Sequence, residues 1–149
     1  MAVSHSLVKA LKRVPGFALL EEEDLLEILG ASVNLVWSAG DCVFSKGTPG
    51  EALYIVLTGR VQIYDEVNDT DIEIAQIAPG DYFGEHSLLC ETTHTKNVKA
   101  LEDVELLVLA KESFNALLAW KPDLDAQIRE TLEARLSQQR EKYDITTAS

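Results

Sequence analysis

Basic residues are scarce in this chain of 149 amino acids. Thirteen lysines and arginines stand against 25 aspartates and glutamates, which gives a formal net charge of −12. The imbalance is uneven, because residues 1–20 hold three basic residues and no acidic one, so residues 21–149 carry −15. A nucleic-acid-binding surface needs a basic stripe that releases counterions from the phosphates. The composition therefore argues against direct binding of DNA or RNA.

Cysteines and long apolar runs are also few. The only two cysteines, Cys42 and Cys90, lie 48 residues apart without a Cys-x-x-Cys spacing, which excludes the disulfide-rich secreted class. No apolar run approaches the roughly 18 residues that a membrane span requires. Pro15 and Gly16 interrupt the segment after the first basic residues, so we recognise no signal peptide. We expect a cytoplasmic protein with reduced thiols and no membrane contact.

Clusters of catalytic or metal-binding residue types are missing. The three histidines, His5, His86 and His94, form no His-x-His pair with a glutamate, as a β-roll metalloenzyme would need. No Gly-x-Ser-x-Gly motif occurs, and no serine has a neighbouring histidine and acid arranged as a triad. We therefore expect no catalytic residue, no metal and no cofactor, and the sequence predicts a protein that is not an enzyme.

What is present indicates one mainly β domain, residues 1–149, with flanking helices. Apolar residues at helical spacing predict N-terminal helices within 1–30 and two C-terminal helices within 111–143. Between them, over 31–110, turn residues every 8–12 positions separate short strands, as in a sandwich or barrel. Segment 38–44 resembles segment 78–84, which suggests a jelly roll of two similar halves with about eight strands. The strands seen individually are 42–44, 52–57, 60–64, 70–77, 95–101 and 104–109.

An apolar stripe marks the last predicted helix. Leu124, Ile128, Leu132 and Leu136 recur at helical spacing and share one face. Such a stripe packs on the roll or pairs with a second copy of the chain as a homodimer, and the pattern leaves both alternatives open.

Segment 83–89, Phe-Gly-Glu-His-Ser-Leu-Leu, differs from the other breaks between strands. It can form a single helical turn, whose first N–H groups have no intrahelical partner and favour an anion. Gly84 would allow close approach of a ligand, and Glu85 would accept bonds from a hydroxyl, so a sugar phosphate suits both. The other interpretation is a short connection between strands with an acid stabilising one helical turn.

The motifs in order are Gly-Asp at 40–41, Pro-Gly-Glu-Ala-Leu-Tyr-Ile-Val-Leu-Thr-Gly-Arg-Val at 49–61 and Pro-Gly-Asp-Tyr-Phe-Gly-Glu at 79–85. Together they resemble the cyclic nucleotide-binding domain family over roughly residues 7–140. The resemblance implies an eight-stranded β-roll with residues 83–100 as the phosphate-binding cassette. It places the cyclic phosphate on Gly84 and the amides near His86 and Ser87, and the ribose 2′-hydroxyl on Glu85. It also implies that Leu88 and Leu89 couple ligand arrival to the C-terminal helix.

One departure from the family pattern concerns the phosphate. Where the family has Pro-Arg-Ala or Pro-Arg-Thr, this chain has Thr93, His94 and Thr95, with Lys96 next. Histidine with its ordinary pKa near 6.5 is mostly neutral at cytoplasmic pH and lacks the bidentate fork of arginine. We therefore expect weakened affinity for a cyclic phosphate. In the family, a hydroxyl after the arginine favours guanine, and Thr95 occupies that place.

These observations lead to two functional hypotheses. In the first, the chain is a regulatory module that binds cAMP or cGMP weakly and signals through its C-terminal helix to a partner protein or fused effector. In the second, the replacement of the arginine by His94 has removed nucleotide binding, and the module serves for protein interaction or dimerisation.

Overall fold

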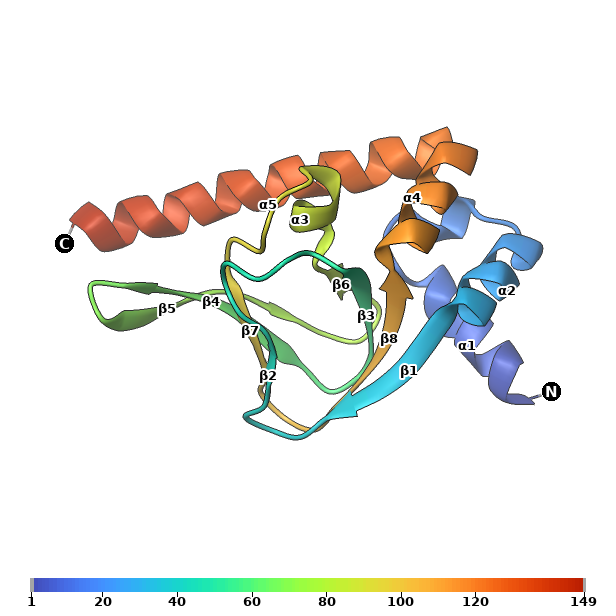
Figure 1. Cartoon of the computed structure of the whole chain (residues 1–149), viewed down its shortest axis with the longest axis horizontal. Helices are drawn as coiled ribbons and strands as arrows, with labels where there is room; N and C mark the ends of the chain where they lie inside the picture. The colour runs from blue at the N-terminus through green and yellow to red at the C-terminus, as the bar shows by residue number, and fades with distance from the viewer. Residues whose placement is uncertain (1, 149) are drawn as a thin grey trace.

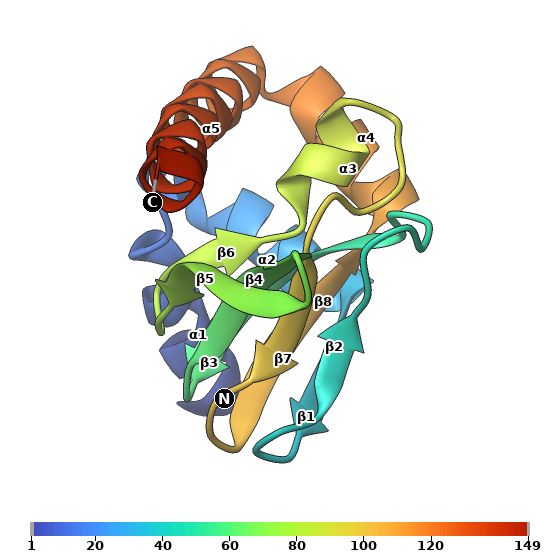
Figure 2. The same cartoon turned by 90° about the vertical axis from the view of Figure 1, so that its left-hand side faces the viewer.

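Two four-stranded antiparallel sheets form the centre of the computed structural model, which describes the backbone of residues 2–148 and the side chains of residues 6–141. The strand orders are β1-β8-β3-β6 and β2-β7-β4-β5. The strands are β1 (Ser32–Trp37), β2 (Cys42–Phe44), β3 (Ala52–Thr58), β4 (Val61–Val67), β5 (Thr70–Ile77), β6 (Tyr82–Phe83), β7 (Asn97–Ala100) and β8 (Val104–Ala110). Figure 2 shows the two sheets curling into a roll.

Helices lie on one side of the roll and across its top (Figure 1). They are α1 (Ala2–Lys12), the short 3-10 helix η1 (Phe17–Leu19), α2 (Glu22–Ala31), α3 (Glu85–Leu89), α4 (Lys111–Trp120) and α5 (Pro122–Ala148). The fold class is confirmed: eight strands make a β-roll, with helices before it and two helices after it.

Alternation along the strands divides the apolar residues between two cores. On β8, Leu106 points into the roll and packs with Val61 and Phe83, whereas Leu107 faces the helices. The second core joins the outer side of the first sheet to helical residues such as Phe17 and Ile128. The roll and its helices are thus held together through a single sheet that has one apolar face in each core.

Two strands had no individual prediction. β1 is an edge strand that pairs only with β8. It has four exposed residues in a row and therefore shows no alternation between buried and exposed positions. β6 is only two residues long and pairs with β3 through Tyr54 and Ile55. β6 is too short for a period-two pattern, and in β1 the alternation over the first four residues breaks off at Val36 and Trp37.

Helix α5 begins at Pro122, the predicted first position, and crosses above α3 before continuing beyond the roll (Figure 1). Leu124, Ile128 and Leu132 are buried by their own chain, and Leu136 is partly buried. This stripe therefore packs on the roll, as in the first alternative of the sequence prediction. A homodimer through α5 stays a prediction, but these three side chains are not available for its interface.

Within the described part of the chain, no helix has the length and apolar character needed to cross a membrane. Among those same residues, no three His, Cys, Asp or Glu side chains are grouped as metal ligands.

Candidate ligand site

Gly84 shapes the start of α3. Its φ of 91° lies in the left-handed region, and a Cβ there would lie 3.0 Å from Tyr54 Cδ2 and 3.1 Å from the Ala52 carbonyl oxygen. The chain can therefore turn from β6 into α3 against the neighbouring strand only with glycine at this position. The turn leads from β6 into α3, which lies against α5 (Figure 1).

All six residues predicted for the site line one cavity. They come from two segments, the turn into α3 and the stretch before β7: Gly84, Glu85, His86, Ser87, His94 and Thr95. The cavity measures about 60 Å³, whereas ligand pockets typically reach about 300–1,000 Å³. The structure thus assembles the predicted residues in a contracted site, and a ligand of nucleotide size requires α5 or the cassette to move.

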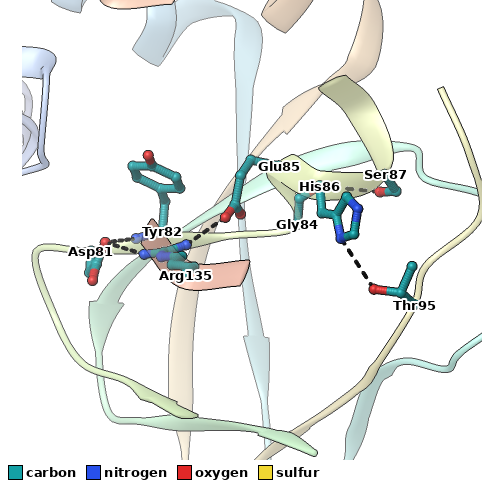
Figure 3. Close-up of polar contacts among 8 residues, drawn as sticks. All are labelled: Asp81, Tyr82, Gly84, Glu85, His86, Ser87, Thr95 and Arg135. Carbon is teal, nitrogen blue, oxygen red and sulfur yellow. Dashed lines mark hydrogen bonds and ion pairs between the residues drawn. The ribbon is translucent and has the colours of Figure 1, made fainter. Parts of the chain in front are cut away.

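The Glu85 carboxylate is buried and holds an arginine from α5. Arg135 donates from one guanidinium nitrogen to Glu85 Oε1 at 2.7 Å and from the other to Asp81 Oδ1 at 2.8 Å (Figure 3). Asp81 Oδ1 also accepts the backbone N–H of Tyr82 at 2.8 Å. Burial alone disfavours the guanidinium charge, but the two carboxylates more than offset it and raise the pKa of Arg135. This charged cluster ties the cassette directly to the last helix.

Tyr82 lies beneath the same guanidinium, whose central carbon is 4.8 Å from the ring centroid. Burial, together with the nearby Glu85 charge, raises the pKa of Tyr82 to about 12. The phenol therefore stays neutral, so Arg135 has an aromatic face on one side and two carboxylates at its edge.

His94 is a buried residue at the wall of the cavity. Its ring stacks on Phe44 with centroids 3.5 Å apart and planes 5° apart, and Nδ1 lies 3.2 Å from Ser87 Oγ. Burial lowers the pKa of His94 below its ordinary 6.5, so the ring is neutral at pH 7. The sequence expectation that this position supplies no permanent positive charge agrees with these surroundings.

The backbone on either side of His94 is pinned to another loop. The His94 N–H donates to the Thr48 carbonyl at 2.8 Å, and the His94 carbonyl accepts from Gly47 at 2.8 Å. Pro49 and Thr93 form an isolated bridge in the same contact. These bonds fix the backbone of residue 94, while the imidazole itself is held by its stacking on Phe44 and its contact with Ser87 Oγ.

His86, Thr95 and Lys96 line the other part of the cavity. Thr95 Oγ1 lies 3.3 Å from His86 Nδ1 (Figure 3). Burial lowers the pKa of His86, partly opposed by Glu85. Burial also lowers the pKa of Lys96, partly opposed by Asp65, and the Lys96 ammonium donates to the Thr95 carbonyl at 3.3 Å.

Sequence reasoning missed two residues that shape this site. Arg135 is 50 positions from Glu85, so no local motif connects them. Its place on α5, three after Leu132 and seven after Ile128, nevertheless puts it on the buried face, which is a usable signal. Phe44, also 50 positions from His94 in sequence, gave no signal because a phenylalanine in a strand is an ordinary core residue.

Two proteins of known identity are similar to this chain in sequence. The Cyclic AMP receptor protein of Thermus thermophilus is 30% identical over 136 residues, which is 91% of this chain and 63% of that protein. The cGMP-dependent protein kinase isozyme 1 of Drosophila melanogaster is 32% identical over 115 residues, 74% of this chain and 15% of the kinase. The chain thus spans less than two thirds of the length of these curated relatives.

Solved structures share the fold of this chain. The catabolite activator protein of Thermus thermophilus superposes with a TM-score of 0.77 at 30% identity, covering 89% of this chain and 63% of that one. The regulatory domain of Toxoplasma gondii PKA with cAMP gives a TM-score of 0.76 at 26% identity, covering 86% and 47%. The family model described as cyclic nucleotide-binding domain matches residues 35–120, more than half of the chain. With its β-roll, its glycine-led turn into α3 and the buried Glu85 that follows, this chain belongs to the cyclic nucleotide-binding domain family.

Proposed function

We propose that this chain is a regulatory ligand-sensing module, not an enzyme, whose cassette binds a cyclic nucleotide and whose α5 reports the binding event. The family supports a cyclic nucleotide as the ligand, since two relatives carry cAMP or cGMP in their names. Gly84, Glu85, His86, Ser87, His94 and Thr95 are the proposed ligand-binding residues, because they line one cavity.

The observation that carries this proposal is the Arg135 bridge. Glu85, the proposed ribose acceptor, already binds Arg135 through Oε1, and Arg135 belongs to the proposed output helix. A carboxylate can accept about four hydrogen bonds, so a ribose hydroxyl can join or displace the guanidinium. In either event the ligand alters the contact that holds α5. The ligand therefore binds with different affinity to different positions of the helix, so that binding shifts the helix position.

We also propose that the affinity for cyclic nucleotides is weakened. A buried phosphate that loses its paired arginine forgoes typically about 2–5 kcal/mol, roughly 30-fold or more in affinity. The neutral, stacked His94 supports this expectation because it supplies no charge at pH 7. Signalling would then run to a partner protein or to a fused effector domain in the cytoplasm, where the exposed, unpaired Cys42 and Cys90 would remain reduced.

The test is titration of the purified chain with cAMP and cGMP by isothermal calorimetry. We expect saturable binding with a Kd below about 1 mM, and loss of binding in Glu85→Gln. Glu51→Gln is the matched control, because Glu51 is an exposed glutamate and is not among the residues that line this cavity. Binding that is the same in all three proteins would show that the carboxylate plays no part.

The second candidate function is an interaction or dimerisation module that binds no nucleotide. The small cavity and the enclosed His94 favour it. The same titration tests this second function, with nucleosides added to the set of ligands. A chain that unfolds cooperatively but shows no saturable response to nucleotides or nucleosides up to millimolar concentration would favour it over the first.

A further inference from the structure

We propose that the site prefers an uncharged ribonucleoside over the cyclic nucleotide of the same base at neutral pH. This inference rests on the proposed ribose-binding role of Glu85. It concerns the other end of the cavity, where Ser87 and His94 lie and where the family resemblance places the phosphate.

The hydroxyl of Ser87 lies between two groups that can accept its proton. Oγ is 3.2 Å from the Gly84 carbonyl, which can only accept, and 3.2 Å from His94 Nδ1, whose role depends on the tautomer. When Oγ donates to Gly84, Nδ1 carries the proton of the neutral ring, and Nε2 is an acceptor that attracts a hydroxyl donor and repels an anionic oxygen. In either tautomer the neutral ring, stacked on Phe44, supplies no positive charge.

The surroundings of Ser87 and His94 leave these two side chains little freedom. A Cβ at Gly50 would lie 2.3 Å from Ser87 Oγ, so the backbone of residue 50 is in close contact with the hydroxyl. Phe44 covers one face of the imidazole, and the bonds to Gly47 and Thr48 hold the backbone of residue 94. A phosphate entering here loses its water without gaining a positive charge from the neutral His94, and an unpaired buried charge is costly.

The positive charges at the cavity are already engaged. Arg135 is shared between Glu85 and Asp81. Lys96 donates to the Thr95 carbonyl and feels the buried Asp65, which also pairs with Lys46 at 3.2 Å. To bind an anion, one of these cations would have to leave its present negatively charged or polar partner. A nucleoside hydroxyl needs no such rearrangement.

The experiment compares adenosine with cAMP and guanosine with cGMP by calorimetry at pH 7.5. We expect each nucleoside to bind about 30-fold or more tightly than its cyclic nucleotide, the lower end of the effect of a missing charge partner. His94→Arg should reverse the order, since guanidinium stays charged and can still stack on Phe44. His94→Gln should keep it, and thermal unfolding of each variant confirms that the chain is folded.

The pH dependence of ligand affinity provides a second test, which does not require that His94→Arg folds. An anion beside His94 favours its protonation, so cyclic nucleotides should gain affinity from pH 7.5 to 5.5 while nucleosides do not. His94→Gln should abolish that gain. The charged and titratable groups that share the cavity are Glu85 and His86 on α3, Lys96 before β7 and Arg135 on α5. His86 is the other histidine at this cavity, so a gain that persisted in His94→Gln would belong to His86 and would contradict the role given to His94.

The outcomes separate this inference from the proposed function. If cyclic nucleotides bind more tightly than nucleosides at pH 7.5, the inference is overturned. If binding is also lost in Glu85→Gln, the proposed function still stands. No binding of any of the four compounds would overturn both.

Discussion

At the scale of single residues, the site depends on backbone that only glycine can provide. Gly84 combines a φ of 91° with contacts of 3.0–3.1 Å for any added Cβ. A non-glycine residue in such a conformation costs about 1–3 kcal/mol. Strain at this position acts directly on Glu85, the next residue, so stability and binding should fall together.

We therefore expect Gly84→Ala to lower the free energy of unfolding by about 1–3 kcal/mol, measured by urea denaturation. Gly30→Ala is the matched control, because Gly30 lies in α2 with ordinary φ and nothing within 4 Å of an added Cβ. In a helix that change stabilises by up to about 1 kcal/mol. Equal effects of the two substitutions would contradict the assigned role of Gly84.

The two cavity histidines predict how stability varies with pH. Burial lowers the pKa of both His86 and His94 in the folded chain below 6.5. The folded state therefore binds fewer protons than the unfolded state as the pH falls through about 6.5, and stability is lost on the acid side. We expect the melting temperature to drop from pH 7.5 to 5.5. The double variant His86→Gln/His94→Gln should show a smaller drop, and an unchanged drop would mean that other groups control this range.

At the scale of elements, two kinds of contact hold α5 against the rest of the chain. Its first half is packed through Leu124 and Ile128, whereas farther along Arg135 binds the cassette. Breaking a buried ion pair leaves an uncompensated charge, which costs about 3 kcal/mol at the lower end of measured values. The partly exposed Asp81 side of the bridge contributes less.

We expect Arg135→Ala to lower stability by about 3 kcal/mol and to speed amide exchange along the second half of α5. Arg129→Ala tests the same helix at an exposed pair with Asp125, whose contribution is about 0.3–0.5 kcal/mol. Urea denaturation and hydrogen exchange by mass spectrometry report both effects. If the two variants behave alike, Arg135 does not hold the helix to the cassette.

Local patterns predicted most elements but not the contacts between them. Period-two alternation predicted β5, and helical spacing predicted α5. In the edge strand β1 the alternation covers only the first four residues, which is too short to identify a strand. The six site residues were predicted because they lie in the segment that resembles the family's phosphate-binding cassette, whereas Arg135 and Phe44 reach the site only through tertiary packing.

At the scale of the whole molecule, the apolar stripe of α5 is used within one chain. Leu132 is 7% exposed, so Leu132→Glu places a charge between α5 and the roll rather than on a free surface. We expect this variant to be strongly destabilised, while Leu136→Glu, at a partly buried position, changes stability less. Denaturation measures both. If sedimentation at micromolar concentration gave a wild-type dimer and a folded, monomeric Leu132→Glu, that result would contradict this packing.

The position of Arg135 along α5 has a mechanical consequence. At about 1.5 Å per residue, α5 is about 39 Å long and Arg135 lies about 20 Å from Pro122. If the helix pivots as a rigid rod at Pro122, any sideways step at Arg135 is doubled at the far end, beyond the rim of the roll (Figure 1). The cassette thus pushes a lever at its midpoint, and a ligand that moves one guanidinium by an ångström moves the tip by about two.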